Sequence, residues 1–374
     1  MDVYMDNGAT TMVASEVVEE MNKYFSENYG NASSLHNKGQ FTRNAIEKAR
    51  EILAKKINAS SDEIIFTSGG SESDNFAIKG YVYANRENGN HLITSKIEHP
   101  AVLETMKGLT EDGFEVTYLD VDKNGFVSLE ELRNAINEKT LLVSIMHANN
   151  EIGTVQDIET IGMICKEKGV AFHTDAVQSF TKENIDVKKQ NIDLVSFSSH
   201  KIHGPKGVGA LYVKKGIKLK KMIDGGHQEF DMRAGTENVP GIMGFAKAIE
   251  LFSDEDILRI KELRDRLMKG LLSIGGVFVN GSLEKHLANN LNVSFEGVDS
   301  KHLLLYLDEA GICVSTGSAC SSDSLKPSYV LEAIGLNHER LNGSLRFTLS
   351  KYNTEEEVDF VIEKVKEIIG KLRK

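Results

Sequence analysis

Apolar residues along this chain follow two periods, and the change from one to the other separates helices from strands. Residues 15–28 and 40–57 repeat apolar residues three or four apart, which predicts two amphipathic helices near the N-terminus. From residue 63 onward, short apolar runs alternate with helical patterns such as residues 157–168. The runs that we expect to form strands are residues 63–66, 91–94, 116–119, 141–146, 170–174, 194–197 and 210–213.

Several of these runs are apolar throughout, which indicates strands that are buried on both faces. Strands that alternate with helices form a mainly parallel sheet covered by helices. We therefore predict an α/β fold with a mainly parallel seven-stranded sheet. Ligands of such sheets gather at the carboxyl ends of the strands, so the polar residues that follow the predicted strands are candidates for a functional site.

The pattern changes after residue 252. A long charged helix over residues 254–274 precedes four short strands, and a helix over residues 355–372 closes the chain. The short strands are expected at residues 277–280, 291–295, 312–315 and 344–349. We expect a large domain over residues 15–252 and a smaller α+β domain formed by residues 253–374 together with residues 1–14.

Composition restricts the kind of protein. The 374 residues are 40% apolar and 26% charged, as in ordinary soluble globular proteins. The net charge of −11 argues against nucleic acid as the main partner. No apolar run approaches the ~18 residues of a membrane-spanning helix, and the first residues have no signal-peptide character. The three cysteines lack the spacing of a disulfide framework. We therefore expect a cytoplasmic protein that binds neither nucleic acid nor membranes.

Lys201 gives the first sign of chemistry. It follows Ser199 and His200 just beyond a predicted strand, where its amine could form a Schiff base with an aldehyde cofactor. Asp175 ends the predicted strand before that one. Pyridoxal phosphate sites pair such a lysine with an acidic residue for the pyridinium nitrogen. A lysine alone is usually a solvated surface residue, but the pair at this spacing predicts a pyridoxal phosphate site.

A glycine–serine turn could hold the phosphate of that cofactor. Residues 67–75 follow a predicted strand and open a helix, and the glycines there would let the backbone approach a phosphate. Ser71 and Asp74 also fit a capping box, so a capped turn without a ligand explains the segment equally well. The position of His200 beside Lys201 favours a phosphate contact for this histidine.

Three further residues are candidates for the site. Gln178 follows Asp175 and could donate a hydrogen bond to the phenolic oxygen of the cofactor. His99 could stack on the pyridine ring and shuttle protons, although a surface turn explains it as well. Arg346, in the strand-like run 344–349, needs a partner. That partner is either a substrate carboxylate held by the guanidinium fork or a structural salt bridge.

Cys320 lies in a run of small and polar residues over residues 315–324. We expect an exposed, mobile loop there. A cysteine on such a loop indicates a reactive thiolate, since unreactive free cysteines are usually buried. Cys313 lies in an apolar strand and Cys165 on the apolar face of a helix, so we expect both in the core.

Residues 120–131 match the loop pattern of a calcium-binding EF-hand. That motif requires a helix on each side, whereas residues 114–119 have the pattern of a strand. A turn at Gly125 and a capping box between Ser128 and Glu131 account for these residues. We therefore predict a turn and a helix start here, and not a calcium site.

Taken together, the motifs resemble those of the NifS/IscS-type cysteine desulfurases, which are fold-type I pyridoxal-phosphate enzymes of the class V aminotransferase group. The resemblance covers nearly the whole chain, and several of the motifs are specific to the family. The matching segments are residues 6–11, 71–75, 95–99, 146–153, 173–178, 196–201, 233–238, 317–320 and 346–347.

The resemblance implies a role for each candidate residue. Lys201 would hold pyridoxal 5′-phosphate as a Schiff base, Asp175 would keep its ring nitrogen protonated, and His99 would stack on the ring and move protons. Cys320 would be the nucleophile that takes up sulfur, and a candidate transient ligand of an iron–sulfur cluster; no resident metal is implied. The remaining residues that the resemblance implies are Gly70, Ser71, Ser198, His200 and Thr236 at the phosphate, Asn150 and Gln178 at the cofactor's substituents, and Asn150 and Arg346 at the substrate's amino-acid end.

The implied reaction converts L-cysteine to L-alanine and passes a persulfide sulfur to an iron–sulfur scaffold or another acceptor protein. A homodimer is also implied, with Thr236 reaching in from the second subunit. The alternatives are a selenocysteine lyase or a class V aminotransferase of the same fold, and an inactive scaffold for sulfur-transfer partners. Cys320 argues against the aminotransferase, and the presence of Lys201 argues against the inactive scaffold. The chain departs from the family pattern at Phe230 and Asp231, in the loop before Thr236.

Overall fold

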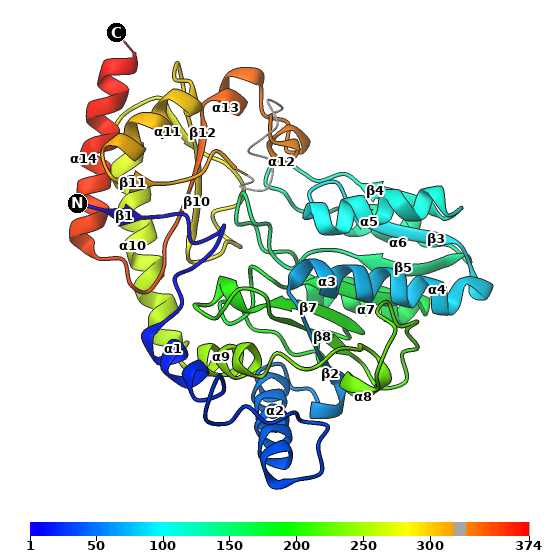
Figure 1. Cartoon of the computed structure of the whole chain (residues 1–374). Coiled ribbons are helices and arrows are strands. Elements are labelled where there is room, and N and C mark those ends of the chain that lie inside the picture. Colours follow the sequence, from blue (N-terminus) through cyan, green and yellow to red (C-terminus); the bar gives the residue numbers. More distant parts are fainter. Residues whose placement is uncertain (318–326, 374) are drawn as a thin grey trace.

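The computed structural model describes residues 1–317 and 327–373. Figure 1 shows a large sheet flanked by helices and, beside it, a smaller part that contains both termini. The strands are β1 (Val3–Tyr4), β2 (Ile64–Thr67), β3 (His91–Ser95), β4 (Glu115–Leu119), β5 (Thr140–Ser144), β6 (Ala171–Asp175), β7 (Leu194–Ser198), β8 (Gly209–Val213), β9 (Val277–Val279), β10 (Asn290–Phe295), β11 (Ile312–Cys313) and β12 (Ser344–Thr348). The helices are α1 (Ser15–Asn22), α2 (Asn37–Lys56), α3 (Gly70–Asn75), α4 (Tyr81–Asn85), α5 (Pro100–Glu111), α6 (Leu129–Ala135), α7 (Ile158–Lys168), α8 (Gln228–Asp231), α9 (Val239–Glu250), α10 (Asp254–Leu272), α11 (Ser300–Glu309), α12 (Tyr329–Ala333), α13 (His338–Asn342) and α14 (Glu355–Leu372).

The large sheet confirms the predicted α/β fold. Its seven strands run in the order β2-β8-β7-β6-β5-β3-β4, and each overlaps one of the seven predicted runs. Only β8 is antiparallel to its neighbours β2 and β7; the pairs among β7, β6, β5, β3 and β4 are parallel. The carboxyl ends of β5, β6 and β7 therefore open onto the same edge of the sheet.

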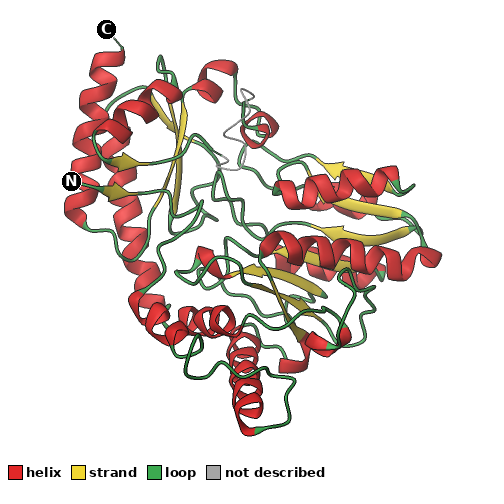
Figure 2. Cartoon of the chain, in the orientation of Figure 1, coloured by secondary structure: helices red, strands yellow, loops and turns green. Residues whose placement is uncertain are grey.

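Both faces of this sheet are covered, as its apolar strands require. On β2, Ile64 and Phe66 pack into one hydrophobic core and Ile65 into another. The first core includes residues of α2, α7 and α9, and the second includes residues of α4 and α5. Figure 2 shows the strands in yellow between these helices in red. The sheet is packed on both faces, and this packing fixes the positions of its strand ends.

Capping residues explain where the long helices begin. Asp157 accepts a hydrogen bond from the backbone of Thr160 at the start of α7, and Gly169 ends that helix in the left-handed conformation. Capping boxes start α10 at Ser253 and α14 at Thr354. The predicted helix over residues 15–28 is shorter than expected, because it ends at Asn22.

The early end of α1 has a reason in its side chains. Tyr24 is buried, but its neighbour Phe25 is 62% exposed. Phe25 therefore gains no burial from a further helical turn, although Tyr24 continues the buried face of Val17, and the backbone turns where the Asn28 N–H donates to the carbonyl of Lys23.

The smaller part has a hydrophobic core of its own. Its three-stranded sheet has the order β12-β10-β9 and is antiparallel, and α10, α11 and α14 contribute apolar residues to the same core. Val3 and Met5 belong to this core, and β1 pairs with β11. These contacts support the division into residues 15–252 and residues 1–14 with 253–374, which stays a prediction.

The segment with the EF-hand pattern has the context that we predicted. The strand β4 precedes it, and the Asp122 carboxylate accepts from the backbone of Asn124 and Phe126 in a turn. Ser128 then caps α6.

In the part of the chain that the structure describes, no helix is long and apolar enough to cross a membrane.

Candidate active site

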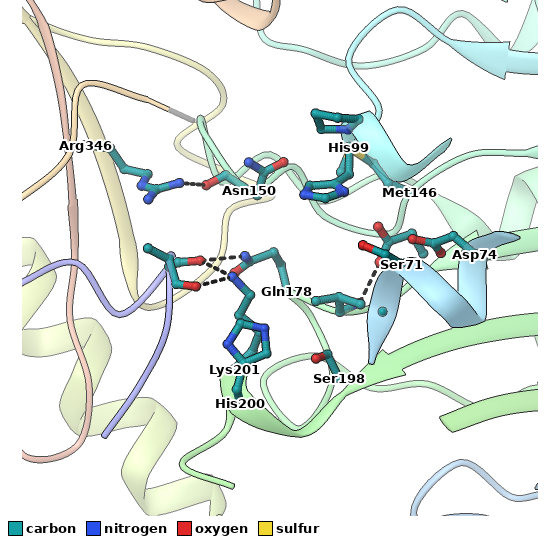
Figure 3. A pocket seen from close by; sticks show the side chains of 16 residues that line it. Ser71, Asp74, His99, Met146, Asn150, Gln178, Ser198, His200, Lys201 and Arg346 are labelled. Atoms are coloured by element: carbon teal, nitrogen blue, oxygen red, sulfur yellow. Dashed lines mark hydrogen bonds between the residues drawn. The ribbon is translucent and has the colours of Figure 1, made fainter. Parts of the chain in front are cut away.

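A cavity of about 200 Å³ lies at the carboxyl ends of the parallel strands. Of the residues predicted for the site, it brings together Gly70, Ser71, His99, Asn150, Asp175, Gln178, Ser198, His200, Lys201 and Arg346. Figure 3 shows Arg346 and Asn150 at one end of this cavity and Ser71 and Ser198 at the other, with His99 across from Lys201. The two ends thus differ in chemistry, one cationic and one rich in hydroxyls.

Lys201 ends a short turn, Ser199–Lys201, that follows β7. Its Nζ donates to the backbone carbonyls of Gly8 (2.6 Å) and Ala9 (2.7 Å). Gln178 also donates to the Gly8 carbonyl, at 3.0 Å. The N-terminal segment is therefore part of the site. Sequence reasoning assigned it no role, and its only signal was the family-like run over residues 6–11.

Asp175 lies at the end of β6, and its Oδ1 accepts from the backbone of Val177 at 2.8 Å. Burial raises the pKa of this carboxyl to about 6, although the Val177 hydrogen bond and the charge of Lys201 lower it. Above that pH the carboxylate is charged inside the protein. It can then stabilise a positive charge on a ring nitrogen held beside it.

His99 caps the start of α5, where its Nδ1 accepts from the backbone of Ala101 at 3.1 Å. Burial, with a further effect from Lys201, lowers the pKa of His99 to about 4. At neutral pH the ring is therefore uncharged, with its proton on Nε2 because Nδ1 is an acceptor. Such an imidazole can lie against an aromatic ring and exchange a proton at Nε2.

The hydroxyl-rich end of the cavity fits a phosphate. A Cβ added at Gly70 would lie 2.8 Å from Cγ2 of Val177, so only glycine leaves this space open. Ser71, Ser198 and His200 also line an adjoining hollow, together with Lys206. Lys206 supplies a positive charge there that sequence reasoning missed.

The predicted capping box of Ser71 and Asp74 is wrong. The helix α3 begins at Gly70, so Ser71 lies inside it and Asp74 is buried. The carboxylate of Glu72 accepts from the Ser68 backbone instead, at 2.8 Å, and pairs with Arg233 at 2.9 Å.

The side chain of Arg346 is buried, and of its two predicted partners the structural salt bridge is present. Its Nη2 pairs with Asp6 at 2.9 Å, and its Nη1 donates to the backbone carbonyl of Asn150 at 2.9 Å. Its Nε and the Oδ1 of Asn150 are buried without a partner in the described structure. Buried polar atoms without partners are costly, so this end of the cavity is suited to a polar ligand.

A layer of buried polar residues under the cavity was not predicted. His173 is hydrogen bonded to Ser144 and Ser196 on the neighbouring strands, at 2.8 and 3.0 Å. Its Nε2 lies 3.7 Å from Asp74, whose pKa is raised by burial and by the charge of Asp175. The parallel strands determine this layer, which no sequence motif marks.

The remaining predicted residues have different outcomes. Cys320 lies outside the described residues. Thr236 is exposed and does not line the cavity of its own chain. Cys165 is buried, as predicted, but Cys313 is exposed. The prediction for Cys313 was wrong because successive side chains of a strand point to opposite faces, and on β11 Ile312 is buried while Cys313 lies on the exposed face.

Comparison with known proteins agrees with the fold. The family model described as Aminotransferase class-V matches residues 3–361. A cysteine desulfurase IscS of Methanosarcina thermophila is 55% identical over 99% of this chain and 93% of its own length. Another, of Clostridium botulinum strain Hall, is 53% identical over 99% of this chain and 95% of its own.

Solved structures of related proteins have the same fold as this chain. A NifS-like protein superposes with a TM-score of 0.93 at 43% identity, covering 99% of this chain and all of that one. SspA in complex with cysteine superposes with a TM-score of 0.86 at 40% identity, covering 94% of this chain. The chain belongs to the aminotransferase class-V family of pyridoxal-phosphate enzymes. Within it, the chain belongs to the cysteine desulfurases of the NifS/IscS type.

Proposed function

We propose that this enzyme removes the sulfur of L-cysteine at the cavity around Lys201, releasing L-alanine and leaving the sulfur on Cys320. The observation that carries the proposal is the arrangement of Lys201, Asp175 and His99 around one cavity with Arg346 at its end. The identity of 55% over nearly the full length of a cysteine desulfurase supports it.

The cavity fits pyridoxal phosphate. Gly70, Ser71, Ser198 and His200 would hold the phosphate, and Asp175 would partner the ring nitrogen. Lys201 would supply the amine that binds the aldehyde. When bound, this cofactor supplies an electron sink for the charge that develops on the substrate's α-carbon.

Arg346 and Asn150 would hold the amino-acid end of the substrate. The guanidinium of Arg346 donates to Asp6 and to the Asn150 carbonyl, and its buried Nε, which has no partner in the described structure, is a donor that a carboxylate could accept from. The opposite positions of this end and the phosphate end in Figure 3 would place the substrate's α-carbon between Lys201 and His99. Either residue could then accept the α-proton.

The sulfur step balances with the residues present. The Cys320 thiolate attacks the substrate sulfur, a sulfur–sulfur bond forms, and the bond between that sulfur and the β-carbon breaks. The β-carbon receives the electron pair and a proton, giving the methyl group of alanine, and the protein retains a persulfide. An acceptor protein, such as an iron–sulfur scaffold, would then take the sulfur. In a homodimer, Thr236 of one subunit would complete the phosphate site of the other.

The experiment is to supply purified protein with cofactor and L-cysteine and to measure alanine and sulfide together, with a thiol reductant present. We expect alanine and sulfide in equal amounts. Alanine without sulfide, or pyruvate as the product, would contradict the proposal. Lys201→Ala is the control, because it removes the amine that binds the aldehyde.

A further inference from the structure

Lys182 is a buried lysine beneath the site whose function no motif indicates. It lies in the turn that follows β6, and only 8% of its surface is exposed. Its Nζ donates to the backbone carbonyl of Gln178 (3.0 Å) and to that of Lys201 (3.3 Å). Among the described residues, no carboxylate lies within ion-pair distance of this amine.

A lysine with only carbonyl partners needs an explanation, since burying its charge is costly. Burial, with the charge of Lys201, lowers the pKa of Lys182 to about 7, and the neighbouring Glu183 acts in the opposite direction. A neutral amine still has two N–H groups. Lys182 can therefore donate to both carbonyls whether or not it is charged.

The two carbonyls that accept from Lys182 belong to Gln178 and Lys201, whose side chains contact the same residue. The side chains of Gln178 and Lys201 both donate to the carbonyl of Gly8, at 3.0 and 2.6 Å. Lys182 thus bridges the backbones of these residues on one side, while Gly8 receives their side chains on the other. The bridge also joins the loops after β6 and β7, which carry Asp175 and Lys201.

We propose that Lys182 is a positioning residue, which holds the backbones of Gln178 and Lys201 together and so orients the Lys201 amine toward its aldehyde partner. The inference rests on the proposed function of Lys201. Its effect is on the chemical step and not on substrate capture, because Lys182 contacts the backbones of Gln178 and Lys201, whereas Arg346 and Asn150, which are proposed to hold the substrate, are hydrogen bonded to each other.

The test compares Lys182→Met, which keeps the length but removes the donors, with Lys182→Gln, which keeps a donating group. Lys189→Met is the control, since Lys189 is exposed and pairs with Glu159. For each variant, cofactor content, melting temperature, kcat and KM for cysteine are measured. Visible circular dichroism of the bound cofactor reports the orientation of the Lys201-linked chromophore before any substrate is added.

We expect Lys182→Met to lower kcat per bound cofactor roughly tenfold or more, with KM nearly unchanged and a weaker dichroic band. Lys182→Gln should lie between Lys182→Met and wild type, and Lys189→Met should match wild type. A wild-type kcat and dichroic band in Lys182→Met would overturn the proposal. If that variant does not fold, a wild-type kcat and dichroic band in folded Lys182→Gln would overturn it. Wild-type protein that forms no alanine would instead contradict the desulfurase function.

Discussion

Asp175 and His99 show how burial gives two titratable residues opposite tasks. The pKa of Asp175 is raised to about 6 and that of His99 is lowered to about 4. At neutral pH the aspartate is therefore charged and the histidine is neutral. A charged partner for a ring nitrogen and an uncharged proton carrier are the states that the proposed chemistry needs. Neither state follows from residue type alone, because the same residues on the surface would titrate elsewhere.

Binding of pyridoxal phosphate to the cofactor-free protein should weaken as the pH falls through about 6. The proton that Asp175 takes up there removes the negative charge that stabilises the ring nitrogen's proton. The folded protein binds that proton at a higher pH than the unfolded chain does, so between about pH 6 and the ordinary aspartate pKa, the folded state gains stability as the pH falls. Fluorescence titration at several pH values measures the affinity.

Asp175→Asn is the control for this prediction. Its affinity should be lower at neutral pH, and the decrease below pH 6 should be smaller than in wild type. An unchanged pH profile in this variant would assign the decrease to the phosphate of the cofactor.

Cys320→Ala should lower the rate of sulfide release from cysteine by roughly 100-fold or more, because it removes the only proposed nucleophile. Its cofactor content should stay as in wild type. The assay is sulfide release with the cofactor band recorded in the same sample. Cys313→Ala is the matched control, since Cys313 is an exposed free cysteine, and it should keep wild-type turnover. Equal turnover in the two variants would refute the assignment.

At the scale of elements, the residues of the site lie at the ends of strands and at the start of a helix. Asp175 ends β6, Lys201 lies one turn beyond β7, and His99 starts α5. Periodicity predicted both strands, because each is a strongly apolar run, but it gave no range for α5. It did not predict the end of α1 or the cap of α3, since both depend on which side chains are buried.

The close contact between α7 and the segment before β7 is a further feature at this scale. A Cβ added at Gly162 would lie 1.9 Å from the carbonyl oxygen of Gln190. Gly162→Ala should therefore lower the free energy of unfolding by about 1–3 kcal/mol through overpacking. Urea denaturation measures the change.

Gly108→Ala in α5 serves as the comparison. An added Cβ there meets nothing within 4 Å, so alanine should be neutral or stabilising by up to about 1 kcal/mol. A loss of stability as large in this variant as in Gly162→Ala would show that contact with Gln190 is not the cause.

At the scale of the whole molecule, chain segments that are distant in sequence meet at the cavity. Asp6 pairs with Arg346, and Gly8 receives the side chains of Gln178 and Lys201. The short element α8, before Thr236, is not a regular helix, because its consecutive residues Glu229, Phe230 and Asp231 all have positive φ. Glu229 pairs with the buried Arg50 at 2.7 Å, which stabilises this unusual backbone.

Mixed dimers test whether Thr236 acts on a second subunit. One subunit carries Lys201→Ala and the other carries Thr236→Val. If Thr236 completes the partner's site, the mixed dimer has one intact site and binds cofactor there with wild-type affinity. If Thr236 acts within its own chain, every site is defective. Cofactor titration of dimers purified through two different tags separates the outcomes.

The sequence by itself determined the elements and the chemistry that follows them along the chain. Strand runs, helix starts and the order of Lys201 and Asp175 depend on neighbouring residues, and local patterns express them. Only the tertiary structure decided that Gly8 lies over Lys201 and that Lys182 lies beneath it. It also decided the protonation of Asp175 and His99. These properties come from burial and from contacts between distant segments, which leave no periodic pattern in the chain.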